Sequence, residues 1–142
     1  MKVKYSDSIE FRLLQRVNAL SDNVLLRKDF EDLAPPRQLS KALKGLVAKK
    51  YLVRIGYGVY AKLNYSKQFN KYYLSDGFLD LSRQALTKLG VVWDLSTSEK
   101  AYNDKLSTQI PVNSSTVING RFKRKLTYNN MEFKIERKKA TA

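Results

Sequence analysis

The sequence contains no cysteine and no histidine among its 142 residues. Without cysteine the chain has no disulfide, no thiol nucleophile and no cysteine-based zinc site. Without histidine it has no Ser-His-Asp triad and no imidazole metal ligand, and the most common general base is missing. No carboxylates are spaced like a two-metal site either. These absences disfavour an enzyme and predict a protein without a cofactor.

Long apolar runs are also missing from the sequence. No stretch approaches the about 18–20 apolar residues that span a membrane, and the first residues lack the apolar run of a signal peptide. We therefore expect a soluble, cytoplasmic protein without a membrane partner.

Acidic residues are scarce relative to basic ones. The chain has 13 Asp and Glu against 27 Lys and Arg, which gives a formal charge of +14. Such an excess points to a polyanionic partner, nucleic acid above all. Apolar residues make up 43% of the chain, enough for a hydrophobic core, and the length fits one compact unit or two small ones.

Two segments in the first half carry apolar residues at helical spacing. One covers residues 6–20. The other, about 36–50, follows the Pro35-Pro36 pair and has a single apolar stripe, formed by Leu39, Ala42, Leu43, Leu46 and Val47. At about 100° per residue, its opposite face carries Arg37, Lys41 and Lys44. Between the two segments, residues 27–33 predict one or two helical turns.

A β-hairpin is predicted after the second helix. Residues 51–55 and 59–63 alternate like strands, and Gly56-Tyr57-Gly58 joins them as a tight turn. Helix, short helix, amphipathic basic helix and hairpin follow one another in the order of a winged helix-turn-helix. We therefore predict a winged helix-turn-helix DNA-binding domain over residues 1–65.

The second half predicts a small α+β domain over residues 66–142, with C-terminal β-hairpins and a basic tail. Residues 64–75 are interpreted as the connection between the domains. Helices are expected over 76–90 and 97–106. Short strands should follow at 110–112, 116–118, 122–128 and 131–135, with hairpin turns at Asn119-Gly120 and Asn129-Asn130. The predicted fold class is α+β.

Seven segments resemble the AbiEi-type antitoxins of abortive-infection toxin–antitoxin systems: residues 8–20, 28–30, 38–43, 51–60, 85–90, 106–111 and 117–121. The sequence Leu-Ser-Thr-Gln-Ile-Pro at 106–111, followed by the Asn-Gly pair, is the most specific of them. The resemblance implies an N-terminal winged helix that binds operator DNA and represses its own operon. It also implies a C-terminal domain that contributes to neutralising a nucleotidyltransferase-like toxin. Larger members have longer C-terminal domains, so a short member can lack part of this second role.

The basic helix and the hairpin supply the candidate DNA contacts. No Asp or Glu occurs from Arg37 to Arg54, so no local charge repels phosphate. The helix face either enters the major groove or is a solvated surface, and Tyr57 either contacts the DNA backbone or fills its turn. Arg54 and Lys62 are predicted phosphate contacts. The full set of candidates is Arg37, Gln38, Ser40, Lys41, Lys44, Arg54, Tyr57 and Lys62.

A second basic run lies near the C-terminus. Arg121, Lys123 and Lys125 alternate with apolar residues. They either form the wet face of an amphipathic strand or extend the contact with nucleic acid.

Two functions of different classes follow from the sequence. The first is a sequence-specific repressor that binds an inverted-repeat operator in double-stranded DNA as a weak homodimer. The second is an interaction protein that antagonises a partner toxin. An orphan regulator and a nucleic-acid binder without sequence preference are the further alternatives.

Overall fold

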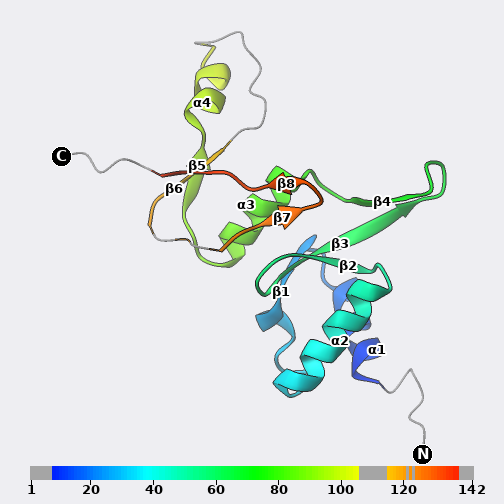
Figure 1. Ribbon diagram of the computed structural model, residues 1–142. Coiled ribbons are helices and arrows are strands. Elements are labelled where there is room, and N and C mark those ends of the chain that lie inside the picture. The colour runs from blue at the N-terminus through cyan, green and yellow to red at the C-terminus, as the bar shows by residue number, and fades with distance from the viewer. Residues whose placement is uncertain (1–7, 106–114, 121, 123, 138–142) are drawn as a thin grey trace, which may run out of the picture. The chain divides into compact units, whose positions relative to one another are not determined.

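The computed structural model describes residues 8–105, 115–120, 122 and 124–137. The chain divides into two compact units, Met1–Gly77 (unit 1) and Phe78–Ala142 (unit 2). Each unit combines helices with small sheets (Figure 1). The predicted α+β class is confirmed.

From residue 8 onward, where its description begins, unit 1 contains two α-helices, one short 3₁₀ helix and one sheet. In chain order its elements are α1 (Ile9–Ala19), β1 (Val24–Leu26), η2 (Arg27–Phe30), α2 (Pro36–Ala48), β2 (Leu52–Gly56), β3 (Val59–Ser66) and β4 (Lys71–Leu74). The strand order is β1-β3-β2, and β4 pairs with the outer part of β3. All of these pairings are antiparallel.

The two helices of unit 1 share one apolar core. Ser8 caps α1 by accepting a hydrogen bond from the Phe11 amide at 3.1 Å, and α2 begins at Pro36, where a missing N–H costs nothing. The apolar stripe of α2 packs with residues of α1 and with Phe30, which is completely buried. The helical periodicity at residues 36–50 therefore predicted correctly which face of α2 is buried.

The predicted β2–β3 hairpin is confirmed. Gly56 pairs with Val59, so the chain reverses over Tyr57 and Gly58. Gly58 has φ +67°, a left-handed conformation that glycine adopts without strain. The register shifts between Arg54 and Gly56, which twists the end of the hairpin.

The expected connection at residues 64–75 is instead part of the sheet. β3 continues to Ser66, and β4 returns beside it with Tyr65 opposite Tyr72. Asn70, with φ +51°, closes the turn. This hairpin gave no clear strand signal because both of its faces are partly exposed and carry polar and aromatic side chains. The division between the two units falls after Gly77, not after residue 65.

The described residues of unit 2 form two helices, a three-stranded sheet and a short hairpin. Its elements are α3 (Phe78–Lys88), β5 (Trp93–Leu95), α4 (Thr97–Asn103), β6 (Thr116–Ile118), β7 (Thr127–Tyr128), β8 (Met131–Glu132) and β9 (Ile135–Arg137). In the sheet, β6 lies between β5, which is antiparallel to it, and β9, which is parallel. β7 and β8 form the hairpin.

One of the two predicted Asn turns in unit 2 is confirmed and the other is wrong. Asn129 and Asn130 join β7 to β8, and Asn129 takes φ +52°. Asn119-Gly120 does not close a hairpin, because the neighbours of β6 are β5 and β9 rather than the segment that follows it. The expected strand at 110–112 lies outside the described residues, as do residues 138–142 of the basic tail.

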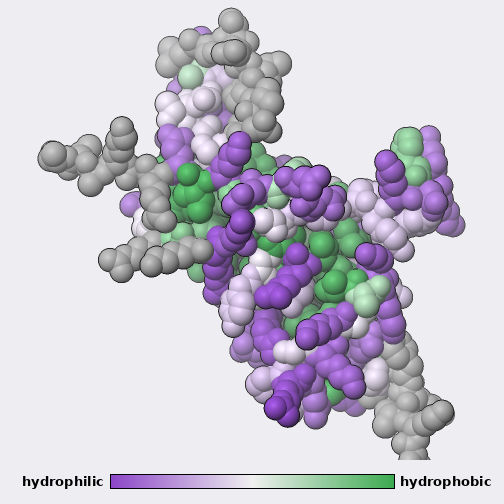
Figure 2. Space-filling model, viewed as in Figure 1, coloured by the Kyte–Doolittle hydropathy of each residue, from purple (hydrophilic) through white to green (hydrophobic). Residues whose placement is uncertain are grey.

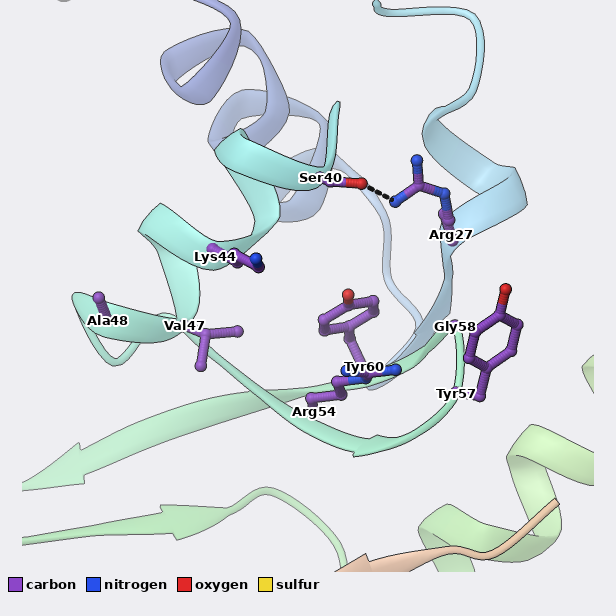
Figure 3. Close-up of a pocket in the computed structure, with 9 residues that line it drawn as sticks. All are labelled: Arg27, Ser40, Lys44, Val47, Ala48, Arg54, Tyr57, Gly58 and Tyr60. Carbon is purple, nitrogen blue, oxygen red and sulfur yellow. Dashed lines mark hydrogen bonds between the residues drawn. The ribbon is translucent and has the colours of Figure 1, made fainter. Parts of the chain in front are cut away.

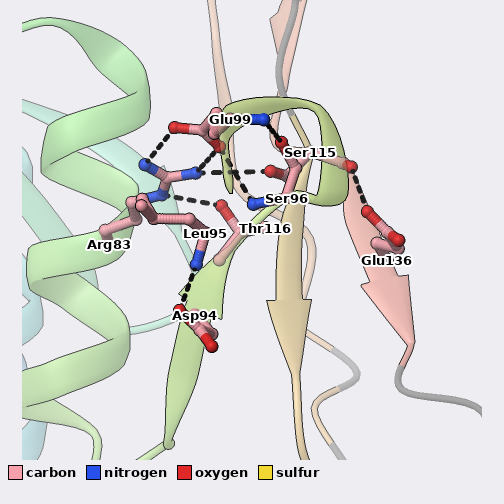
Figure 4. A network of polar contacts seen from close by, with 8 residues as sticks. All are labelled: Arg83, Asp94, Leu95, Ser96, Glu99, Ser115, Thr116 and Glu136. Atoms are coloured by element: carbon pink, nitrogen blue, oxygen red, sulfur yellow. Dashed lines mark hydrogen bonds and ion pairs between the residues drawn. The ribbon is translucent and has the colours of Figure 1, made fainter. Parts of the chain in front are cut away.

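A buried arginine links the elements of unit 2. Arg83 of α3, only 6% exposed, donates to Thr116 Oγ1 at 2.9 Å and to both carboxylate oxygens of Glu99 at 3.1 and 2.6 Å (Figure 4). Its guanidinium also lies 5.1 Å from the centroid of the Trp93 ring. The network thereby joins α3 to α4, β5 and β6.

Candidate nucleic-acid interface

The outward face of α2 carries the cations that the helical periodicity placed there. Arg37, Lys41 and Lys44 are exposed, and so is Gln38 beside them, whereas Ser40 is half-buried. The apolar stripe on the other side of the helix fixes this orientation, because its leucines lie in the core. The basic face is therefore held in solvent by the packing beneath it.

Two concave surfaces adjoin this face and share Ser40 and Lys44. One has a volume of about 540 Å³ and lies between α2 and the β2–β3 turn; the other, of about 420 Å³, lies along the first turns of α2. We call the combined surface the α2 groove. It is lined by Arg27, Pro36, Arg37, Ser40, Lys41, Lys44, Val47, Ala48, Arg54, Tyr57, Gly58 and Tyr60.

The charge of the α2 groove is of one sign. Its five charged residues are all basic: Arg27, Arg37, Lys41, Lys44 and Arg54. None of them forms an ion pair with a residue that the structure describes, whereas the nearby Lys49 pairs with Glu10 at 2.7 Å. No Asp or Glu occurs anywhere from Leu33 to Ser75. The groove can therefore offer its positive charges to an anion without displacing an internal carboxylate.

Arg27 is a groove residue that sequence reasoning missed. Its guanidinium donates to Ser40 Oγ at 2.9 Å (Figure 3) and also to the Pro36 carbonyl at 2.8 Å. Its backbone N–H donates to the Gly58 carbonyl at 2.9 Å. Arg27 thus ties the start of α2 and the β2–β3 turn to the same point. No local sequence signal marks it, because its partners lie 9 to 31 positions further along the chain.

The β2–β3 turn brings an arginine and a tyrosine to the edge of the groove. Arg54 donates through Nε to the Gly56 carbonyl at 3.2 Å, and its guanidinium lies 5.9 Å from the centroid of the Tyr57 ring. Tyr57 itself is 74% exposed. Stacking against the ring orients the guanidinium while leaving its N–H groups able to donate. Behind them, the hydroxyl of the buried Tyr60 is directed into the space beside α2 (Figure 3).

A comparison with protein families matches residues 13–141 to DUF6088, a family of unknown function. The chain belongs to this family. No curated protein and no solved structure shows significant similarity to it. The match extends from the middle of α1 past the end of β9, so it covers the entire α2 groove of this DUF6088 member and most of each unit.

The predicted contact Lys62 lies apart from the α2 groove of this DUF6088 member. Its side chain is half-buried, and its ammonium donates to the carbonyl of Leu20 at the end of α1. Lys62 is absent from the residues that line either concave surface. The sequence predicted a phosphate contact at Lys62, but β3 is the central strand here and the ammonium of Lys62 is engaged by the Leu20 carbonyl.

The second basic run is described only in part. Arg121 and Lys123 lie outside the described residues. Lys125 is exposed, and its ammonium lies 3.8 Å from Glu132 on β8. Lys125 therefore already has a carboxylate beside it, whereas Lys41 and Lys44 of α2 form no ion pair with a described residue.

The chemistry that the α2 groove offers is charge and hydrogen-bond donation. Among the described residues, no three His, Cys, Asp or Glu side chains are grouped so that they could hold a metal ion. No helix within the described part of the chain is long and apolar enough to cross a membrane. A positively charged, donor-rich groove along an exposed helix is suited to binding phosphate groups.

Proposed function

We propose that the α2 groove binds double-stranded DNA and that the chain is a sequence-specific transcriptional repressor with a winged helix-turn-helix in unit 1. The observation that carries this proposal is the continuous concave surface along α2, lined by five cations and by no acidic residue. Each Lys or Arg that reaches a phosphate releases condensed counterions, and so such a surface gains affinity for DNA at low salt.

The dimensions of α2 support entry into the major groove. The helix has 13 residues and is therefore about 20 Å long. With its side chains it is about 10–12 Å across, and the major groove is about 12 Å wide. In a helix-turn-helix the first residues of the recognition helix meet base edges. Arg37 and Gln38 occupy that position here.

The flanking residues suit contacts to the DNA backbone. Arg54 and Tyr57 extend from the turn beside α2, as a wing does, and Lys41 and Lys44 lie further along the helix. These side chains would position the protein on the phosphates, while Arg37 and Gln38 would read sequence. Because Arg27 is already bonded to Ser40 and Pro36, its role would be to hold α2 in place as well as to add charge.

The resemblance to AbiEi-type antitoxins extends the proposal to partners. It implies that unit 2 contributes to neutralising a nucleotidyltransferase-like toxin. Independently of the resemblance, we propose that two copies bind an inverted-repeat operator as a weak homodimer in the cytoplasm. A neighbouring toxin gene would support the neutralising role. A lone gene would support the alternative of an orphan regulator.

The first test is selection from a random pool of 30-bp duplexes by the full chain, followed by fluorescence anisotropy. We expect enrichment of one sequence and a binding constant that falls steeply with salt. The double variant Lys41→Ala/Lys44→Ala should weaken binding to all duplexes and lower the salt slope by about one unit for each lost contact. Arg12→Ala is the matched control, because Arg12 is an exposed cation of α1 outside the groove.

The second test separates recognition of bases from recognition of charge. Gln38→Ala should cost about 1–3 kcal/mol on the selected duplex and relax its preference over other sequences, without altering the salt slope. If selection enriches no sequence, the chain is a non-specific binder. If Arg37→Ala, Lys41→Ala and Lys44→Ala together leave binding unchanged at moderate salt, α2 is not the recognition helix.

The partner proposal has its own test. Co-expression of the full chain with a neighbouring nucleotidyltransferase-like toxin should restore growth, and residues 1–77 alone should not. Rescue by residues 1–77 would contradict the assignment of neutralisation to unit 2. Failure of the full chain to rescue would leave only the regulator.

A further inference from the structure

The β3–β4 hairpin extends away from the rest of its sheet. From Asn64 onward, the strand partner that the structure describes for β3 is β4 alone, whereas its first half is flanked by β1 and β2. Figure 1 shows this part of the hairpin reaching beyond the other strands of unit 1. We call residues 64–73 the β3–β4 arm. It lies outside the α2 groove.

The arm is held in shape by its own side chains. The rings of Tyr65 and Tyr72 are in contact across the strands, with centroids 4.9 Å apart and planes tilted by 52°, and the Tyr65 hydroxyl donates to the Asn70 side-chain oxygen. The backbone N–H of Phe69 donates to Ser66 Oγ at 3.3 Å. These contacts fix the turn at the end of the arm, so a side chain placed there is presented on a stiff support.

The end of the arm presents a phenylalanine to solvent. Phe69 is 68% exposed. The ring has no polar atom that could form a hydrogen bond with water. Burying its apolar surface against a partner would therefore be favourable. Its neighbours in the sequence are Lys67, Gln68, Asn70 and Lys71, all exposed. Figure 2 shows this mixture of hydrophilic and hydrophobic surface at the end of the hairpin.

The composition of the arm favours DNA over a second protein chain. Lys, Asn and Gln are the side chains that read the minor groove, and an apolar wedge between two base pairs is the usual companion of such contacts. The segment from Leu33 to Ser75 contains no acidic residue that would repel phosphate. Pairing of two arms from two copies would bring Lys67 and Lys71 of each against like charges, which opposes self-association at this point.

We propose that the β3–β4 arm is a second DNA-contacting element, which lies in the minor groove and inserts Phe69 between two base pairs of the duplex. This inference rests on the proposed DNA binding by the α2 groove and adds a contact of a different chemical kind. Lys67 and Lys71 hold the flanking phosphates, while Gln68 and Asn70 contact base edges. The inserted ring unstacks one base step and bends the duplex.

The test uses the full chain and the duplex recovered by selection, with 2-aminopurine replacing each adenine in turn. Binding of the unmodified chain should raise the 2-aminopurine fluorescence at one base step and bend the duplex by about 20–90° in a circular-permutation gel assay. Phe69→Ala should abolish both signals and weaken binding by about fivefold to 150-fold, in line with the loss of one stacked ring. Phe69→Leu should keep most of the bend, because leucine also acts as a wedge.

Two controls separate the arm from the α2 groove. Met131→Ala removes an exposed apolar side chain from strand β8 of another hairpin and should change neither signal. Lys41→Ala/Lys44→Ala should weaken binding, yet at saturating protein the 2-aminopurine signal should return to its full value.

Each contrary outcome overturns the inference in a recognisable way. If the chain binds the duplex and Phe69→Ala retains the affinity, the bend and the fluorescence change, the arm does not insert, and the proposed function stands. If Phe69→Ala changes the molar mass in light scattering but not the 2-aminopurine signal, the arm joins copies of the chain instead. If the unmodified chain binds no duplex, the proposed function and the inference both fail.

Discussion

Unit 1 and unit 2 bury different kinds of side chain. Among the residues that the structure describes, the buried part of unit 1 is apolar throughout, from Leu13 to Ala61. The four buried polar or charged residues, Ser82, Arg83, Ser96 and Thr116, all belong to unit 2. In unit 1 the apolar stripe of α2 lies in this core, and it anchors the helix while the cations on its other face remain in solvent.

Because the two units bury different side chains, their stability depends on different properties of those side chains. An apolar core tolerates small adjustments and loses stability in proportion to the volume removed. A buried ion pair depends on both partners being in place, because a single remaining charge is left without compensation. We therefore expect unit 1 to be sensitive to side-chain size and unit 2 to be sensitive to side-chain charge.

The largest expected effect is that of Phe30→Ala in unit 1. Phe30 is completely buried in the core cluster, so its removal should leave a cavity and lower the free energy of unfolding by about 3–5 kcal/mol. The single tryptophan of the chain, Trp93, lies in unit 2 and reports on that unit by fluorescence. Urea unfolding followed by circular dichroism should show an early loss of unit 1. A Trp93 transition that moves by the same amount would mean that the two units unfold together.

Removing one partner of the buried ion pair should have the next largest effect. In Glu99→Gln the Arg83 guanidinium keeps its position but loses its counter-charge. We expect a loss near the lower end of the range for buried pairs, about 3 kcal/mol, because Glu99 is not fully buried. Urea unfolding followed by Trp93 fluorescence should measure this loss of stability directly.

A double variant tests whether charge is what matters. Arg83→Met/Glu99→Gln should be less destabilised than Glu99→Gln alone, since no unpaired charge remains. Strictly additive losses would show that Arg83 contributes through packing against Trp93 and not through the ion pair.

Low pH should lower the stability of unit 2 by protonating the Glu99 carboxylate. Hydrogen bonds from Arg83 hold the pKa of Glu99 below its ordinary value of 4.5, and bonds from Ser96 add to this. A lowered pKa in the folded state stabilises the fold above the unfolded pKa, and this stabilisation is lost as the pH falls through the folded pKa. The Trp93 transition should therefore shift to lower urea as the pH falls below about 4.5.

The pH effect has a matched control in unit 1. Arg16 lowers the pKa of Asp32 by a hydrogen bond, but this pair lies at the surface. Asp32→Asn should leave the pH dependence of the Trp93 transition unchanged, whereas Glu99→Gln should remove most of it. A pH dependence that survives Glu99→Gln would assign it to another carboxylate of unit 2.

The sequence predicted those parts of the molecule in which local pattern decides structure. The stripe from Leu39 to Val47 predicted α2 within two residues of its observed end, and the glycines at 56 and 58 predicted the β2–β3 turn. Where pairing depends on distant segments, the local pattern was insufficient. Asn119-Gly120 has the composition of a hairpin turn, yet β6 pairs with β5 and β9.

In the candidate site, too, the sequence predicted what local pattern decides and missed what depends on distant segments. The cations of α2 followed from helical spacing, because position on a helix fixes direction. Arg27 was missed, and the contact of Lys62 with Leu20 was not foreseen, for one reason: the direction of each side chain depends on tertiary packing. Arg27 reaches Ser40 and Pro36, and Lys62 reaches Leu20, across separations that no local pattern encodes.

The smallest expected effect distinguishes Lys62 from the lysines of α2. Lys62→Met keeps the aliphatic stem but removes the hydrogen bond to the Leu20 carbonyl, so the free energy of unfolding should fall by about 1 kcal/mol. Affinity for the selected duplex should stay within about twofold, whereas Lys44→Ala, with its side chain in the groove, should lower both the affinity and the salt slope. Stability comes from urea unfolding by circular dichroism, and affinity from anisotropy at two salt concentrations. If Lys62→Met lowers the salt slope as much as Lys44→Ala does, Lys62 leaves Leu20 for a phosphate when DNA binds, and the contact surface extends from α2 across β3.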